Sequence, residues 1–348
     1  MSKIEVGVLG ATGMVGQQFV NQLRDHPWFE LPWLGASERS AGKTYEEATN
    51  WVQDAAIPAQ IASKAVQACE PEGSPKLVFS AMDASVAGEI EQAFAKAGCV
   101  VVSNSRNHRM DHDVPLLVPE INADHLGVIK AQRKNRGWTG AIVTNPNCST
   151  IAMTMGLAPM KPFGITRILA TTLQAISGAG YPGLPAVDIV ANVIPFIGGE
   201  EEKMETETLK ILGAFGGGEM KPLEAVVSTH CNRVQVIDGH TVAVSVELEQ
   251  RPGLAELASA IREFRGVPQQ KGLPTAPEQP VHLRTEPNRP QTRRDAMAEN
   301  GMAVSVGRLR ECPILGYKFV ALGHNTIRGA AGAAVLNAEL LKTEGWLD

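Results

Sequence analysis

A glycine-rich turn near the start of the chain constrains the fold more than any other feature. A short apolar segment, IEVGVL, leads into Gly10, Gly13 and Gly16, and a helical pattern, MVGQQFVNQLRDH, follows directly. Glycines at this spacing allow a tight turn, close approach of the backbone to a pyrophosphate, and close packing of helix on strand. A tight turn with a purely structural role is the alternative. The position between a first strand and a first helix favours a dinucleotide-binding βαβ unit.

The remainder of the chain divides into two patterns. Before residue 150, the short β-rich segments FELPWLGAS, KLVFSAM, CVVVSNS and AIVTN alternate with helical ones such as SVAGEIEQAFAKAG, which predicts a parallel sheet covered on both faces. Beyond residue 165, longer segments such as RILATTLQAIS and HTVAVSVELEQ alternate apolar and polar positions, which predicts a largely antiparallel sheet with one covered face. We expect helices near 185–195, 200–212 and 253–265 to cover it, and a surface connection or sheet edge at the proline-rich 272–291. The predicted class is α/β, a Rossmann-type domain followed by an α+β domain.

Composition excludes several classes of function. The 348 residues are 44% hydrophobic with a formal net charge of -5, so there is no basic surplus for binding nucleic acid. No apolar run reaches the length of a membrane span, and the chain enters an apolar strand at once, which leaves no room for a signal peptide. Five scattered cysteines without CxxC pairs suggest neither a disulfide framework nor a zinc cluster. We therefore expect a cytoplasmic protein without a metal.

The segment after the second predicted strand bears on the choice of cofactor. Ser37, Arg39 and Ser40 suit the 2′-phosphate of NADP, whereas Glu38 would suit the ribose diol of NAD. A solvated charged loop is the alternative interpretation. The balance of residue types favours NADP.

Cys148 lies where a predicted strand passes to a predicted helix, in TNPNCST. The cysteine is either a small buried hydrophobic residue or a thiol at a helix N-terminus, where the dipole and free N–H groups would favour the thiolate. Beside a nicotinamide cofactor, such a thiolate could add to an aldehyde and form a thioester after hydride transfer.

That chemistry also needs a proton shuttle, for which histidine is the usual residue. His240 follows a turn-forming Asp-Gly at the start of a strand, and Arg233 lies seven residues upstream. Glu200 and Lys203 are one helical turn apart, hence on one face. Taken singly, each of these residues is more commonly a solvated side chain, and their spacing does not establish that they converge.

A set of motifs spread over the whole chain resembles the aspartate-semialdehyde dehydrogenase family, in the branch found in archaea and fungi. These motifs, in order, are GATGMVG, SNSRNHRM, TNPNCST, LQAISGAGYPG, GGEEEKMETE, CNRVQVIDGH and GHNTIRGAAGAAV. One minor departure is Gln235, at a position where the family pattern usually has proline.

The resemblance implies roles for individual residues. Cys148 would be the nucleophile, His240 the acid/base, and Gln174 would orient the acyl intermediate. Arg233 would hold the substrate carboxylate and Glu200 its ammonium group, while Arg109 and Lys203 would bind phosphate. The implied cofactor-binding residues are Gly10, Thr12, Gly13, Met14, Val15, Gly16, Ser37, Arg39, Ser40, Asn147, Ser177, Gly178, Asn325 and Thr326.

The resemblance also implies an organisation and a reaction. Residues 1–147 and 325–348 would form the NADP-binding domain, and 148–324 a catalytic and dimerisation domain of a homodimer or dimer of dimers. The reaction would be reversible reductive dephosphorylation of L-4-aspartyl phosphate to L-aspartate 4-semialdehyde, which feeds lysine, methionine and threonine synthesis. Rival interpretations are malonyl-CoA reductase, N-acetyl-glutamyl-phosphate reductase, and a non-catalytic NADP-binding sensor.

Overall fold

The computed structural model describes residues 3–347. The first sheet is built from β1 (Ile4–Leu9), β2 (Phe29–Ala36), β3 (Gln67–Ala68), β4 (Leu77–Ser80), β5 (Val100–Ser103) and β6 (Ala141–Thr144). Its strand order is β3-β2-β1-β4-β5-β6, and every pair of neighbours is parallel. The order reverses between β1 and β4, where the carboxyl ends of the strands form the usual ligand crevice of such sheets. The predicted parallel sheet is confirmed.

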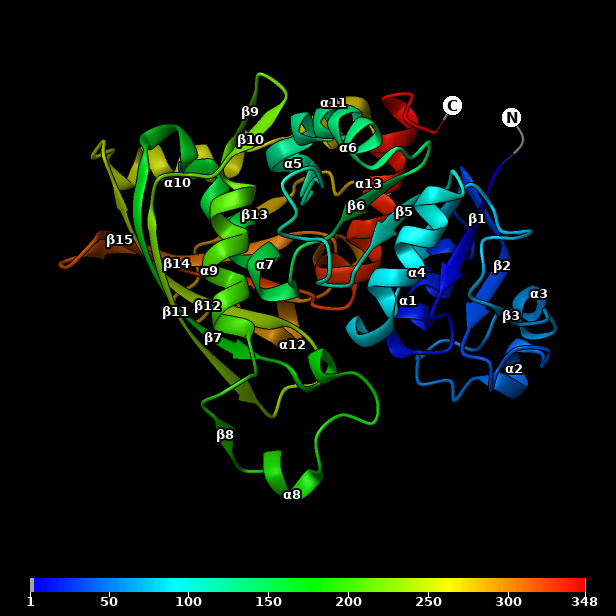
Figure 1. Ribbon diagram of the computed structural model, residues 1–348. Helices are drawn as coiled ribbons and strands as arrows, with labels where there is room; N and C mark the ends of the chain where they lie inside the picture. Colours follow the sequence, from blue (N-terminus) through cyan, green and yellow to red (C-terminus); the bar gives the residue numbers. More distant parts are fainter. Residues whose placement is uncertain (1–2, 348) are drawn as a thin grey trace.

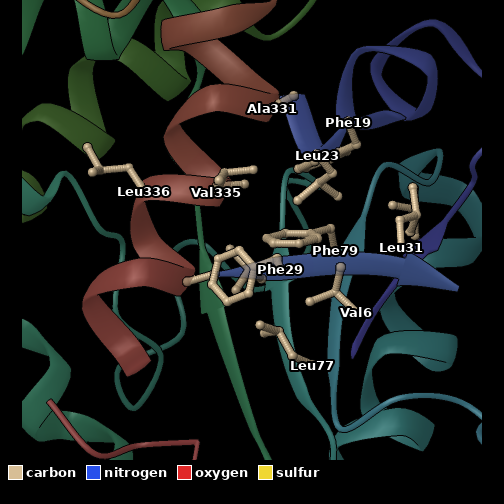
Figure 2. Close-up of a cluster of buried hydrophobic side chains, with 14 of the residues drawn as sticks. Val6, Phe19, Leu23, Phe29, Leu31, Leu77, Phe79, Ala331, Val335 and Leu336 are labelled. Carbon is tan, nitrogen blue, oxygen red and sulfur yellow. The ribbon is translucent and has the colours of Figure 1, made fainter. Parts of the chain in front are cut away.

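Helices cover both faces of this sheet (Figure 1). On one face, Phe19 and Val335 belong to a buried cluster that also contains Phe79 of β4 (Figure 2). On the other face, Phe94 packs in a separate cluster with Val78. Val335 comes from the last helix, so the C-terminal segment packs against the N-terminal sheet. The helices of this part are α1 (Met14–Leu23), α2 (Tyr45–Ala48), α3 (Ala59–Ala62), α4 (Ala84–Lys96), α5 (Pro119–Asn122), the 3₁₀ helix η1 (Ala123–Val128), α6 (Ile129–Arg136) and α13 (Gly332–Thr343).

The second sheet has seven strands in the order β13-β14-β15-β12-β7-β11-β8. Their bounds are β7 (Ile165–Gln174), β8 (Val193–Ile194), β11 (Val226–Val234), β12 (His240–Leu248), β13 (Val281–Arg284), β14 (Val304–Cys312) and β15 (Gly316–Gly323). The pairs β7–β11 and β13–β14 are parallel, and the other four are antiparallel. The sheet is therefore mixed, as predicted, and the edge strand β13 lies within the proline-rich segment.

One face of the second sheet carries the core of this part of the molecule. Helices α7 (Cys148–Leu157), α9 (Glu200–Ile211) and α10 (Leu254–Glu263) lie on this face and contribute Met153, Met204 and Leu257 to a buried cluster with strand residues (Figure 1). The opposite face leaves Leu169 and Leu173 of β7 exposed. The expectation of a sheet with one covered face is met.

The prediction of a helix near 185–195 is wrong. The structure has only α8 (Ala186–Ile189) there, followed by β8, which pairs with β11. Ala191 has a positive φ of 56°, which ends the helical path, and Pro195 follows soon after. Apolar residues such as Val187 and Phe196 are exposed along this arm, so no buried face supports a longer helix.

The remaining elements are short segments between the strands and helices of the second part or at its junctions with the first. The expected C-terminal helix is split, because a π-helical turn, η5 (Ile327–Ala331), precedes α13. The other short elements are η2 (Ala158–Phe163), η3 (Ile176–Ala179), β9 (Ala214–Gly216), β10 (Glu219–Lys221), α11 (Val267–Lys271), α12 (Thr292–Asp295) and η4 (Ala298–Gly301). Within residues 3–347, no helix is both long and apolar enough to cross a membrane.

Candidate active site

Cys148 is the first residue of α7, directly after the β6–α7 connection. Asn147 caps this helix, because its Oδ1 accepts hydrogen bonds from the backbone N–H groups of Ser149 (3.0 Å) and Thr150 (3.3 Å). The helix is buried from Ser149 to Leu157. The sequence Asn-Pro-Asn thus ends a buried strand and starts a buried helix, with the thiol at the helix N-terminus.

Four strand ends meet beside this junction, and that arrangement gathers residues from distant parts of the sequence. Gln174 ends β7 and lies opposite Arg233 of the parallel strand β11. His240 begins the antiparallel strand β12 and lies opposite Gly323, which ends β15. The register of the second sheet therefore places Gln174, Arg233 and His240 at the same end of three neighbouring strands.

His240 is fully buried and held by a main-chain group. Its Nδ1 accepts a hydrogen bond of 3.0 Å from the backbone N–H of Ala175, and its Nε2 has no partner among the described residues. The NH1 group of Arg233 donates a hydrogen bond of 2.6 Å to the carbonyl oxygen of Ala175. A Cβ built on Gly178 would lie 2.9 Å from Arg233 NH1 and 3.1 Å from His240 Nε2, so both side chains face this glycine.

Glu200, the first residue of α9, connects several candidate residues. Its carboxylate accepts from Asn147 Nδ2 (3.0 and 2.8 Å), Gln174 Nε2 (3.1 Å) and Lys203 Nζ (2.7 Å). Burial opposes ionisation of this carboxyl, but the Lys203 ammonium and these donors lower its pKa. An anionic group therefore lies next to the residue that precedes the thiol.

Arg109 reaches the site from the loop after β5, and its partners include a residue that the sequence did not single out. Its NH1 donates to Glu207 of α9 (2.9 Å) and its NH2 to the carbonyl of Asn104 (2.7 Å). Glu207 also accepts from the backbone N–H of Asn147 (2.6 Å). The only sequence signal for Glu207 is its spacing of two helical turns from Glu200, which places both on one face of α9.

The electrostatic surroundings of Cys148 differ from the expectation of a favoured thiolate. Burial, and after it the Glu200 carboxylate, raise the pKa of the thiol to about 12. Arg109, Arg233 and the backbone N–H of Ser149 act in the opposite direction but do not outweigh burial. In the ligand-free protein the thiol is therefore protonated near neutral pH.

The η5 segment, which follows β15 near the C-terminus, packs against Cys148 through Gly329. A Cβ on Gly329 would lie 2.6 Å from the Cβ of Cys148, so only glycine fits there without a shift. Asn325 donates from Nδ2 to Ser177 Oγ (2.7 Å) and accepts from the backbone N–H of Gly239 (2.8 Å). Thr326, the residue before η5, is buried. Gly329 thus lies against Cys148, Gly178 lies beside His240, and Asn325 links Ser177 to Gly239, the residue before His240.

The glycine-rich turn forms a second group of candidate residues, in the first sheet. Gly10 has a φ of +73°, and a Cβ on Gly16 would lie 2.3 Å from the Gly10 carbonyl, so both positions require glycine. Gly13 caps α1 without a side-chain hydrogen bond, and the first turn of α1 contains no acidic residue. With Thr12, Met14 and Val15 beside it, this uncapped N-terminus fits a pyrophosphate group.

The segment after β2 lies next to this turn. The N–H of Ala11 donates to the carbonyl of Gly35 (2.9 Å), and the N–H of Ser40 donates to the carbonyl of Ser37 (2.8 Å). Ser37, Glu38 and Arg39 are exposed on the resulting tight turn. The turn is therefore placed at the carboxyl end of the strand beside β1, where ribose groups of dinucleotides bind.

Comparison with known proteins agrees with this geometry. Two family models match the chain: semialdehyde dehydrogenase, NAD binding domain, over residues 5–129, and semialdehyde dehydrogenase, dimerisation domain, over 157–328. The aspartate-semialdehyde dehydrogenase of Archaeoglobus fulgidus is 48% identical, with 98% of this chain and 99% of the relative covered.

Solved structures give the same result. The aspartate-semialdehyde dehydrogenase of Candida albicans with NADP superposes with a TM-score of 0.91 at 44% identity, over 99% of both chains. Aspartate-semialdehyde dehydrogenase II of Vibrio cholerae, complexed with ASA, gives 0.77 at 29% identity, also over 99% of both chains. The chain therefore belongs to the aspartate-semialdehyde dehydrogenase family.

Proposed function

We propose that this chain catalyses the reversible, NADPH-dependent reductive dephosphorylation of L-4-aspartyl phosphate to L-aspartate 4-semialdehyde. The observation that carries the proposal is the convergence of three charged groups, Arg109, Glu200 and Arg233, on the thiol at the start of α7. A dianionic acyl phosphate with an α-ammonium and an α-carboxylate needs cations for its anionic groups and an anion for its ammonium. The family membership of the chain supports the same substrate.

The chain's own residues supply the acyl-transfer chemistry. The sulfur of Cys148 bonds to the acyl carbon while the bond from carbon to the phosphate oxygen breaks, and the thiol proton leaves with the phosphate as HPO₄²⁻. This route needs no separate base on the protein, which suits a thiol that is protonated in the ligand-free state. Arg109 and Lys203 bind the phosphate group. NADPH, when bound, supplies the hydride.

Positioning of the acyl group falls to the residues around Cys148. Arg233 binds the α-carboxylate through its guanidinium, and Glu200 binds the ammonium group. The Nε2–H of His240 donates to the carbonyl oxygen, whose negative charge grows as the tetrahedral adduct forms on the thiol. Gln174, fixed by Glu200 and Thr172, orients the acyl chain beside the cysteine.

NADP is the proposed cofactor, and the relative from Candida albicans was solved with it. Ser37, Arg39 and Ser40 would bind the 2′-phosphate, and the uncapped N-terminus of α1 the pyrophosphate. Asn147, Ser177, Gly178, Asn325 and Thr326 form the part of the site near the thiol that would receive the nicotinamide.

Three further features are part of the proposal. The domain boundaries would lie at 1–147 with 325–348, and at 148–324. The exposed leucines Leu169 and Leu173 on the uncovered face of the second sheet, together with the dimerisation-domain match, support a homodimer or a dimer of dimers. The five cysteines are free, which fits a reducing cytoplasmic compartment.

Rival activities on this scaffold make different demands on Glu200. Malonyl-CoA and an N-acetylated substrate carry no ammonium group, so they would offer the Glu200 carboxylate no substrate cation. A deciding experiment compares phosphate-dependent NADP reduction with aspartate semialdehyde against malonyl-CoA reduction, using the Cys148→Ala protein as control. Turnover with aspartate semialdehyde that disappears in the variant supports the proposal. Cofactor binding without turnover on any substrate would identify a sensor instead.

A further inference from the structure

Glu207 joins the loop of Arg109 to the start of the nucleophile helix. It is 2% exposed, and each carboxylate oxygen accepts one donor: Arg109 NH1 at 2.9 Å and the backbone N–H of Asn147 at 2.6 Å. Arg109 belongs to the loop after β5, and Asn147 directly precedes Cys148. One buried carboxylate thus fixes the phosphate-binding cation relative to the reacting thiol.

The two groups that Glu207 holds are not equally restrained by other contacts. Asn147 keeps two hydrogen bonds from its side-chain amide to Glu200 and caps α7 through Oδ1. Among residues 3–347, the Arg109 guanidinium has only one other hydrogen-bond partner, the carbonyl of Asn104. Loss of Glu207 should therefore displace Arg109 much more than Cys148.

The Arg109 guanidinium also retains a donor for an anion. Its Nε is buried and has no hydrogen-bond partner among residues 3–347, and the whole residue is 7% exposed. A buried guanidinium N–H without an acceptor is costly unless a ligand oxygen completes it. Glu207 and Asn104 occupy the other two nitrogens and so determine where this free N–H lies.

The backbone of Arg109 is held by the same helix. One turn after Glu207, Lys210 donates from Nζ to the carbonyls of Arg109 (2.7 Å), Asp111 (2.8 Å) and Val114 (2.8 Å). Helix α9 therefore restrains both the main chain and the guanidinium of Arg109, while its first turn carries Glu200 and Lys203.

We propose that Glu207 is a positioning residue for the phosphate half of the reaction, which it serves by holding the Arg109 guanidinium in the orientation that receives a phosphate oxygen. The inference rests on the proposed function. It separates the two half-reactions, because the hydride half needs Cys148 and His240 but not Arg109.

The test compares Glu207→Gln and Glu207→Asp with the control Glu202→Gln, which removes the same charge from an exposed position on the same helix. Glutamine can accept from only one of the two donors, because its N–H₂ group faces the other, and it removes the negative charge that strengthens the Arg109 contact. We expect the KM for inorganic phosphate to rise at least about tenfold in Glu207→Gln, the factor associated with one charge-assisted hydrogen bond. Glu207→Asp, which keeps the charge, should lie between the parent and Glu207→Gln.

Two further readouts distinguish this role from a general loss of structure. The burst of NADPH formed without phosphate, which reports acylation of Cys148, should change less than about threefold, since Asn147 and Cys148 stay restrained. Calorimetric titration of the variants with inorganic phosphate alone should show the same weakening as the KM. Should Glu207→Gln fail to fold by circular dichroism, Glu207→Asp carries the comparison.

A KM for phosphate within twofold of the parent value would overturn the inference. So would an NADPH burst in Glu207→Gln that decreases by the same factor by which the KM for phosphate rises. An equal effect in Glu202→Gln would overturn it too, because the effect would then be one of net charge. Failure of the proposed function is a different result: the parent itself would show no phosphate-dependent turnover of aspartate semialdehyde.

Discussion

The backbone N–H of Ala175 donates a hydrogen bond of 3.0 Å to Nδ1 of His240. Because Nδ1 is the acceptor, the neutral ring carries its proton on Nε2, the nitrogen that faces Gly178. Burial, followed by the nearby Arg233 charge, lowers the pKa of His240 to about 3, so the ring is neutral at working pH. His240 is therefore placed to donate a hydrogen bond to an oxyanion.

This tautomer leads to a prediction about two amide variants. The side-chain amide of His240→Gln can place an N–H₂ group near the position of Nε2, whereas that of His240→Asn reaches only the position of Nδ1. We expect His240→Ala to lose about 10²- to 10³-fold in kcat, the cost of removing one donor to the oxyanion, and His240→Gln to retain more kcat than His240→Asn. Steady-state kinetics on the three variants provides the measurement. Equal or greater activity in the asparagine variant would contradict the assigned tautomer.

Acid stability gives an independent measurement on the same residue. The folded-state pKa of His240, about 3, lies below the ordinary value of 6.5, so the unfolded chain binds more protons between these two values. The free energy of unfolding therefore falls as the pH drops below 6.5, by about 1.4 kcal/mol from this group one unit below that value. Denaturant titrations at several pH values should show a shallower loss in His240→Gln. Parallel pH dependences for parent and variant would contradict the lowered pKa.

The arrangement at His240 also shows which features of the site could not be predicted from the sequence. Local patterns correctly predicted the glycine-rich turn, the parallel sheet and the start of a helix at Cys148. The convergence of Gln174, Arg233 and His240 depends on the register of three strands, which no local pattern specifies. The position of Glu207 between Arg109 and Asn147 could not be predicted from the sequence either, since Glu207 is one of several glutamates in α9 and only its packing distinguishes it.

Ionisation of Cys148 should depend on Glu200. The Glu200 carboxylate raises the pKa of the thiol, so Glu200→Gln should lower this pKa and increase the thiolate fraction at a given pH. We expect iodoacetamide to alkylate Cys148 several-fold faster in Glu200→Gln than in the parent near neutral pH. Mass spectrometry of the Cys148 peptide measures the rate, and the exposed Glu202→Gln variant is the control. A slower reaction in Glu200→Gln would show that loss of position outweighs charge.

Cofactor choice should depend on Arg39. The residue is exposed on the turn after β2, beside the glycine-rich turn. Removing its charge-assisted contact to a 2′-phosphate should cost about 1.5–3 kcal/mol, which raises the KM for NADP roughly 10- to 150-fold. The KM for NAD should barely change in Arg39→Ala. A parent enzyme that prefers NAD would show that Glu38 binds the ribose diol and that the proposed preference is wrong.

The closest steric constraint on the nucleophile comes from Gly329 in the π-helical turn η5. A Cβ at this position would lie 2.6 Å from the Cβ of Cys148 and 3.1 Å from its Cα, which are not flexible side-chain ends. Gly329→Ala must therefore shift either η5 or the start of α7, and a displacement of about 1 Å at a reacting group can reduce the rate about 10²-fold. We expect kcat to fall by this order.

Gly253→Ala is the matched control for this prediction, because a Cβ there meets no atom within 4 Å. The control should keep the parent kcat, which separates the steric effect at Cys148 from any general effect of replacing glycine. Circular dichroism and thermal unfolding of both variants establish that the fold is intact before kinetics are compared. If Gly329→Ala keeps the parent kcat, η5 yields to the new methyl group without moving Cys148, and the turn does not determine the position of the nucleophile.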